Sequence, residues 1–82
     1  PLSLYAIIKE VHGIQRFQLI QTGENQLELR LVGEDRSQVF IAAKQAIECY
    51  LLQNGVVATV HLSELLPQAN PMSGKFKHIV AL

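Results

Sequence analysis

The spacing of apolar residues changes along the chain, and each change predicts a new element. The first spacing is the i, i+3, i+4, i+7 stripe of an amphipathic helix, formed by Leu4, Ile7, Ile8 and Val11. Ser3 is suited to the N-cap of this helix, and Gly13 can take the left-handed conformation that often ends one. We therefore predict a first helix from about Ser3 to His12.

Two segments with alternating apolar and polar residues follow. The first, IQRFQLIQ, covers residues 14–21 and places Phe17 and Leu19 on one face. The second, QLELRLV, covers residues 26–32 and places its leucines on one face, with Glu28 and Arg30 on the other. The polar TGEN segment between them contains a glycine, so the two segments are predicted to form a β-hairpin.

Helical spacing returns after this hairpin. Asp35 or Ser37 can cap a second helix, whose apolar positions are Phe40, Ala43, Ile47, Tyr50 and Leu51. The Asn54-Gly55 pair is a typical helix end, because glycine accepts the left-handed conformation found there. The element is therefore predicted to end at this pair.

The C-terminal third of the chain is read from β-branched residues and then from turn residues. VVATVHL is rich in valine and predicts a third strand from about Val56 to Leu62. Beyond Ser63, prolines, asparagine and glycine predict a loop. The final FKHIVAL is compatible with a last short strand or with a turn.

These elements predict one α+β domain with the order α-β-β-α-β. We expect a small sandwich of the ferredoxin-like type, in which two helices cover one face of a three-stranded mixed sheet. Such a sheet leaves its other face without cover. A helix that opens the chain is also what remains when a split β-α-β unit is cut. We therefore expect residues 1–82 to be a single domain of a longer protein.

Composition and charge exclude several classes of function. The apolar fraction of 49% is ample for one modest core in 82 residues. A formal net charge of zero lacks the electrostatic footprint of nucleic-acid binders and of polybasic membrane patches. The single cysteine excludes an internal disulfide and fits a reducing compartment. We expect a cytoplasmic protein whose partners include neither nucleic acid nor membrane.

Most candidate reactive side chains have a simpler structural interpretation. His12, His61 and His78 are scattered over separate elements without metal-ligand spacing, so no metal site is predicted. We interpret His61 as a surface or edge residue. Cys49 is interpreted as a buried, inert thiol, because no basic residue is placed to activate it. The pair Glu34-Asp35 suits the N-terminal end of a helix.

The Gly74-Lys75 pair near the C-terminus leaves two interpretations open. A phosphate-binding P-loop requires GxxxxGK[ST] followed by a helix, but here Phe76 follows Lys75 and the chain is too short for the helix. Spacing alone favours a solvated tail lysine. The other interpretation is a shaped loop in which Gly74 permits close approach of a partner. Lys75 would then present its ammonium to a carboxylate or phosphate oxygen.

The segment SGKFK at residues 73–77, following this order of elements, resembles the C-terminal lid of adenylate-forming acyl-CoA ligases. Within that superfamily it is most similar to the phenylacetate–CoA ligase-like branch. HGIQRFQLIQ and QLELRLV resemble the paired strands of that branch, and NGVVATVHLSELLPQ resembles its last strand and exit. The resemblance covers nearly the whole chain.

This resemblance implies a ligase that joins a carboxylate to AMP from ATP and then passes the acyl group to coenzyme A. It implies that Lys75 is catalytic in the first step and that Ser73 and Gly74 bind substrate. ATP, with Mg²⁺, would be held by an N-terminal adenylation domain of the same chain. That domain would also choose the carboxylic acid and the thiol. The segment of 82 residues alone would bind no cofactor and show no activity.

The chain also departs from the family's pattern. Many relatives carry an arginine just before the Gly-Lys pair or two to three residues after it, and in those regions this chain has Met72, Lys77 and His78. The anchoring of the loop is therefore left open by the resemblance. The alternative function is a non-catalytic ferredoxin-like module for regulation or oligomerisation. Such a module would use its open sheet to bind a small molecule or a second copy in a homodimer.

Overall fold

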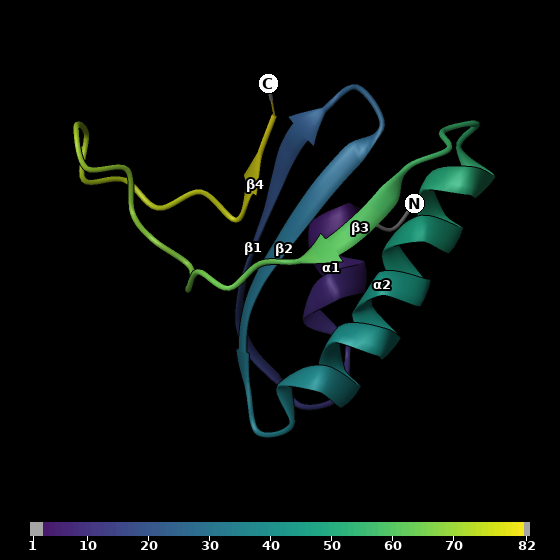
Figure 1. Cartoon of the computed structure of the whole chain (residues 1–82), viewed down its shortest axis with the longest axis horizontal. Helices are drawn as coiled ribbons and strands as arrows, with labels where there is room; N and C mark the ends of the chain where they lie inside the picture. Colours follow the sequence, from purple (N-terminus) through teal and green to yellow (C-terminus); the bar gives the residue numbers. More distant parts are fainter. Residues whose placement is uncertain (1–2, 82) are drawn as a thin grey trace.

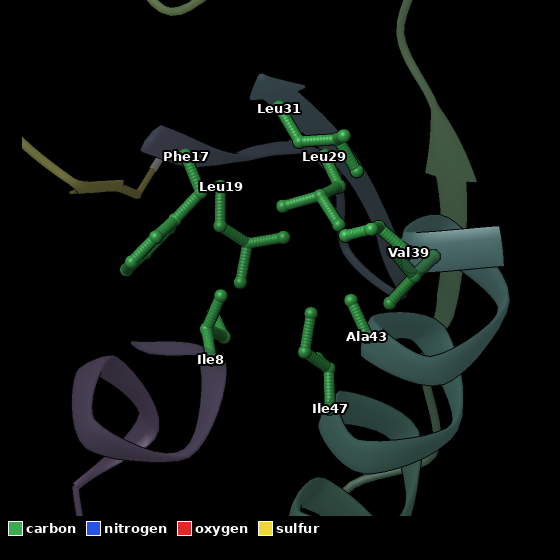
Figure 2. Close-up of a cluster of buried hydrophobic side chains, with 9 residues drawn as sticks. Ile8, Phe17, Leu19, Leu29, Leu31, Val39, Ala43 and Ile47 are labelled. Carbon is green, nitrogen blue, oxygen red and sulfur yellow. The ribbon is translucent and has the colours of Figure 1, made fainter. Parts of the chain in front are cut away.

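The computed structural model describes residues 3–81, which form a mixed sheet with two helices on one face (Figures 1 and 2). The sheet has four strands in the order β3-β2-β1-β4. Along the chain the elements are α1 (Leu4–Lys9), β1 (Ile14–Gly23), β2 (Gln26–Gly33), α2 (Arg36–Gln53), β3 (Thr59–Leu62) and β4 (Ile79–Val80). The α+β class and the order of the first five elements are as predicted.

The predicted hairpin is the centre of the sheet. Strands β1 and β2 pair antiparallel, with Phe17 opposite Leu31 and Leu19 opposite Leu29. Strand β3 then pairs parallel to β2, and α2 provides the connection between them. Parallel neighbours need such a crossover, so the strand–helix–strand pattern in the sequence fixes this half of the sheet.

The prediction of three strands is wrong, because residues 79–80 form a fourth. Strand β4 pairs parallel to the outer side of β1, with Ile79 beside Leu19 and Val80 beside Ile20. The N–H of Leu19 also donates to the carbonyl of His78 at 2.7 Å. A strand of only two residues has no readable period, so the pattern could not separate it from a turn.

The first helix is shorter than predicted. Ser3 caps it as expected, since its Oγ accepts from the N–H of Ala6 at 3.2 Å. The helix ends at Lys9 rather than His12. Gly13 is left-handed, with φ of 89°, but it serves the turn that leads into β1 rather than the helix end itself.

The second helix has the caps that were predicted, and its C-terminal cap shortens the strand that follows. Asp35 accepts from the N–H of Gln38 at 3.3 Å. At the other end Gly55 is left-handed and donates to the carbonyl of Leu52, while Val56 donates to that of Leu51. This is the Schellman arrangement, and it holds Val56 against the helix. Strand β3 therefore begins at Thr59, not at Val56.

The core lies between the two helices and the hairpin (Figure 2). Its buried members are Ile8, Phe17, Leu19, Leu29, Leu31, Val39, Ala43, Ile47 and Val60. The strand faces agree with the predicted alternation. On α2 the buried row includes Val39, whereas Phe40, Tyr50 and Leu51 are only partly buried. The predicted stripe was thus placed slightly off the true buried face.

The backbones at Gly13 and Gly33 lie close together, near the turn between α1 and β1. A Cβ at Gly33 would lie only 2.7 Å from the main-chain oxygen of Gly13, so one of the two backbones would have to shift. We expect Gly33→Ala to destabilise the domain by about 1–3 kcal/mol in urea unfolding. Gly23→Ala is the matched control, because its Cβ would meet its nearest neighbour at an ordinary 3.5 Å. Equal effects of the two variants would contradict the steric explanation.

The face of the sheet away from the helices, for which the predicted architecture provided no cover, is covered around Gln18. Gln18 is 5% exposed although it points away from the core. Its Nε2 donates to the carbonyls of Gln68 and Lys77, each at 3.0 Å, and its Oε1 accepts from the N–H of Gln68 at 3.1 Å. The loop between β3 and β4 therefore covers this part of the outer face.

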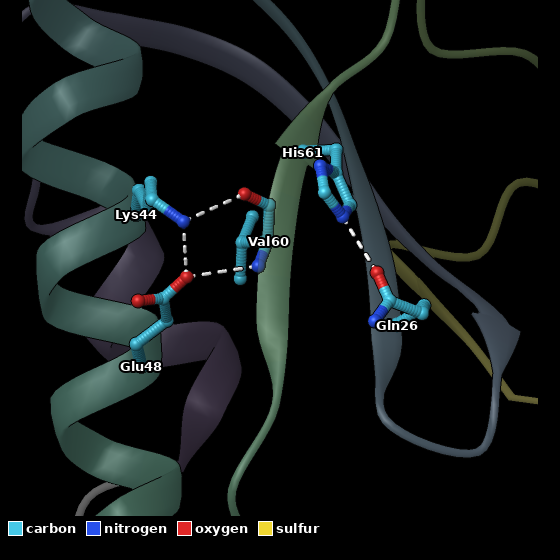
Figure 3. A network of polar contacts seen from close by, with 5 residues as sticks. All are labelled: Gln26, Lys44, Glu48, Val60 and His61. Atoms are coloured by element: carbon cyan, nitrogen blue, oxygen red, sulfur yellow. Dashed lines mark hydrogen bonds and ion pairs between the residues drawn. The ribbon is translucent and has the colours of Figure 1, made fainter.

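The free edge of β3 is occupied by two side chains of α2 (Figure 3). Thr59 and Ser63 donate their N–H groups toward β2, so the main-chain groups of Val60 face outward. The N–H of Val60 donates to Glu48 at 2.9 Å, and its carbonyl accepts from Lys44 at 3.0 Å. Lys44 and Glu48 also form an ion pair with each other. A further strand could not pair here without displacing them.

This network predicts a pH dependence of stability. The hydrogen bond from Lys44, followed by that from the N–H of Val60, lowers the pKa of Glu48 below its ordinary 4.5. A depressed carboxyl pKa stabilises the fold above the unfolded value, and that stabilisation is lost as the pH falls through the folded value. The stability difference between wild type and Glu48→Gln should therefore shrink below about pH 4.5.

Urea unfolding of both proteins from about pH 6 to about pH 3 measures this difference. Glu24→Gln, in the exposed hairpin turn, serves as the control and should track the wild type throughout. A wild-type advantage over Glu48→Gln that stays constant down to the lowest pH would contradict the assignment.

Candidate functional site

The loop that carries the Gly-Lys pair is closed on itself at Asn70. The carbonyl of Asn70 accepts a hydrogen bond from the N–H of Gly74 at 2.8 Å. The N–H of Asn70 donates to the carbonyl of Lys75, also at 2.8 Å. Its Oδ1 accepts from the N–H groups of Met72 and Ser73, at 2.8 and 3.3 Å. This is an Asx turn extended into a small ring of main-chain bonds. The segment has the shaped conformation that one of the two interpretations required.

Gly74 has a conformational role in this loop. Its φ of 72° lies in the left-handed region, which side chains with a Cβ rarely adopt. Apart from Gly74 itself and its two chain neighbours, no described residue has an atom within 4 Å of where a Cβ would stand, so the backbone angle alone favours glycine. The main chain around it is accordingly open to a close approach from outside.

The main chain of Lys75 forms hydrogen bonds within the loop, whereas its ammonium forms no ion pair with the described residues. Its N–H donates to the Oγ of Ser73 at 3.3 Å, so the predicted binding residue Ser73 helps to orient the predicted catalytic one. The side chain of Lys75 is exposed, and within residues 3–81 it makes no ion pair. In Figure 1 the segment between β3 and β4 projects away from both helices. The loop is thus presented at one end of the domain.

An aromatic cluster anchors the loop to the sheet, and sequence reasoning missed it. The ring of His78 lies 4.8 Å from that of Tyr5, 5.1 Å from that of Phe17 and 4.9 Å from that of Phe76, measured between centroids. The guanidinium of Arg16 lies over Phe76 at 5.3 Å. His78 occupies one of the positions at which many members of the resembled family were expected to carry an arginine, and its ring contacts are the anchoring that is found here instead. The only available signal was the Phe-x-His spacing, which places both rings on one side of an extended chain.

Lys75 and Ser73 also line a cavity of about 500 Å³ between the loop and the outer face of the sheet. The sheet contributes Gln18 and Arg30, and the cavity's full lining is Gln18, Ile20, Arg30, Gln68, Ala69, Asn70, Pro71, Ser73, Lys75, Lys77 and Val80. The structure thus brings the predicted loop residues beside Gln18 and Arg30 of the sheet, which no sequence pattern had linked to them.

The other reactive side chains do not gather into a site. His61 is exposed on the edge strand, as predicted, with its Nε2 2.6 Å from the Oε1 of Gln26 (Figure 3). Cys49 is exposed, so its interpretation as a buried thiol is wrong. It lies two residues past Ile47, about 200° around the helix from the buried row. In the described part of the chain no group of His, Cys, Asp and Glu is placed to hold a metal ion.

None of the helices described in residues 3–81 has the length and apolar character needed to span a bilayer. Comparison of the chain with protein-family models, with curated proteins and with solved structures finds no match.

Proposed function

We propose that this chain is the mobile C-terminal domain of an ATP-dependent, adenylate-forming carboxylate–CoA ligase of the phenylacetate–CoA ligase-like kind. The observation that carries the proposal is the closed loop at Asn70–Lys75, which presents an exposed lysine with no ion-pair partner in the described residues. Such a lysine is free to enter the site of another domain. The resemblance of the surrounding segments supplies the kind of site.

In this proposal Lys75 acts in the first half-reaction. A carboxylate oxygen of the acid attacks the α-phosphorus of ATP, the bond to pyrophosphate breaks, and an acyl-adenylate forms. Negative charge gathers between the carboxylate and the α-phosphate, where the Lys75 ammonium would donate hydrogen bonds. In the second half-reaction a thiol attacks the acyl carbon and AMP leaves. The lysine is not needed there, because the domain has rotated away.

The conformation of the loop supports a role of Lys75 in the first half-reaction. Ser73 fixes the main chain of Lys75, and Gly74 leaves the backbone uncovered for a close approach to substrate. A preorganised donor costs little reorganisation when the transition state forms. The aromatic anchor at His78 keeps the loop attached to the domain, so that a rotation of the domain would move the lysine as a unit.

The alternative of a non-catalytic oligomerisation module receives less support. That function needs an open sheet face or edge. The side chains of Lys44 and Glu48 occupy the outward groups of β3 at Val60. Gln18 and the loop above it occupy part of the outer face. Neither surface is a ready template for a second copy, and the opposite edge of the sheet is formed by β4, a strand of only two residues.

The coding sequence upstream of Pro1 is the quickest test between the two functions. A ligase predicts several hundred further residues in the same reading frame, with a phosphate-binding loop rich in Ser, Thr and Gly. A start codon immediately before Pro1 would overturn the proposal and favour the separate module.

A further inference from the structure

We propose that the cavity between the outer sheet face and the 68–77 loop binds an organic phosphate monoester. Its lining concentrates positive charge in a chain whose formal net charge is zero. Arg30, Lys75 and Lys77 all line it, and no aspartate or glutamate does so among the described residues. Like charges gathered without counter-charges raise the local concentration of an anion.

The strongest sign of a missing partner is at Arg30. Its Nε is buried and has no hydrogen-bond partner in the described structure. Its Nη1 donates to the Oε1 of Gln18 at 3.3 Å. A buried guanidinium donor left unpaired is costly, and each such group calls for an explanation. Because this Nε is closed to solvent, an anionic oxygen in the cavity would supply the missing acceptor only after a rotation of the Arg30 side chain.

Gln18 holds this arrangement in place without being a ligand itself. Its amide nitrogen spends both hydrogens on the carbonyls of Gln68 and Lys77, and its oxygen accepts from Gln68 and Arg30. This fixes the rotamer of Gln18, one donor of Arg30 and both ends of the covering loop. One end of the Arg30 guanidinium and the main chain of the loop are therefore held before any ligand arrives, which reduces part of the ordering cost of binding.

The donor set and the size of the cavity favour a phosphate monoester over smaller anions. A guanidinium fork matches two oxygens of a phosphate, and two lysines can neutralise the charge of about −1.5 to −2 that a monoester carries at neutral pH. The cavity of about 500 Å³ exceeds the space that one tetrahedral anion fills. Ile20, Pro71 and Val80 line the remainder, which suits the organic part of the ligand.

This assignment does not depend on the proposed ligase function. It rests on the cavity formed by β1, β2 and the loop, and on a ligand that the chain binds without a second domain. Lys75 is shared by both proposals, so the binding experiment uses Arg30 and Lys77 instead. A failure of phosphate binding would leave the role of Lys75 in adenylate formation untouched, and the reverse also holds.

The test is a titration of the ¹⁵N-labelled chain followed by NMR, at constant ionic strength maintained with sodium chloride. Glycerol 3-phosphate is the probe, and inorganic phosphate and acetate are run in parallel. We expect saturable shifts of the Gln18 side-chain amide, of the Arg30 Nε–H and of the 68–77 main chain. Glycerol 3-phosphate should bind more tightly than inorganic phosphate, and acetate should bind most weakly.

The variants decide whether the cavity is responsible. Arg30→Gln should weaken binding about tenfold or more, since it removes a charged donor. Lys77→Gln keeps the carbonyl that Gln18 uses and should weaken binding about threefold. Lys9→Gln removes the same charge outside the cavity and should change nothing.

Three results would overturn the assignment: shifts that do not saturate, an equal loss in Lys9→Gln, or acetate or inorganic phosphate binding as tightly as the monoester. If Arg30→Gln loses its dispersed spectrum, the comparison of Lys77→Gln with Lys9→Gln decides the question alone.

Discussion

Replacing Lys75 by alanine is expected to slow acyl-adenylate formation about 10²–10³-fold in the full-length protein to which this chain is proposed to belong. In the proposed mechanism, the variant lacks one preorganised positive charge at the place where negative charge develops. The loop itself should persist, because its ring of hydrogen bonds uses the main chain of Lys75 and not its side chain. The exchange of radiolabelled pyrophosphate into ATP, at saturating carboxylic acid, measures this step.

Lys9→Ala is the control for this experiment. Lys9 is also exposed, and it lies on α1 beside the ring of Tyr5, outside the loop and the cavity. Its removal should leave the exchange rate within about twofold, as expected of a surface position. If Lys75→Ala and Lys9→Ala exchange pyrophosphate at similar rates, Lys75 has no special part in adenylate formation.

Ile47→Ala is expected to destabilise the domain by about 2–5 kcal/mol, the largest effect on stability that we predict. Ile47 is fully buried on α2 and packs in the core between that helix and the hairpin (Figure 2). Its truncation removes apolar contacts and leaves a cavity that the surrounding side chains can fill only in part. Small domains have a total stability of about 5–15 kcal/mol, so this one change threatens the fold.

Ile41→Ala provides a matched comparison on the same helix. Ile41 is 60% exposed, so the same chemical change should alter the free energy of unfolding by no more than about 0.5 kcal/mol. Urea unfolding followed by circular dichroism measures both variants. Similar midpoints for the two would show that the core described for α2 is misplaced.

The hairpin and the long helix could be predicted because their signals are local. The alternation around Phe17 and Leu29 specifies which face is buried, and Asp35 and Gly55 mark the ends of α2. Strand β4 could not be predicted in the same way. Its two residues form a strand only because the outer edge of β1 offers main-chain partners, and that is a property of the assembled sheet.

In the candidate site, too, the features with local signals could be predicted and those that depend on distant parts of the chain could not. An ordered turn around Gly74 could be predicted, because glycine, proline and asparagine are turn-forming residues that can be recognised in the sequence itself. The two loop residues that pair with Gln18 lie 50 and 59 positions further along the chain. The unpaired donor of Arg30 also becomes visible only once the loop folds over β2. In the sequence, Gln18 and Arg30 look like ordinary polar residues on the solvent side of a strand, and no local pattern sets them apart.

Thioester formation from a preformed acyl-adenylate tests the central claim most directly. Wild type and Lys75→Ala of the full-length protein would each be given synthetic acyl-adenylate and coenzyme A, and the first turnover followed by rapid quench. In the proposed mechanism the lysine acts only in the closed state for adenylation, so we predict rates within about twofold of each other. A loss in this second step as large as the loss in pyrophosphate exchange would contradict the assignment of Lys75 to a moving lid.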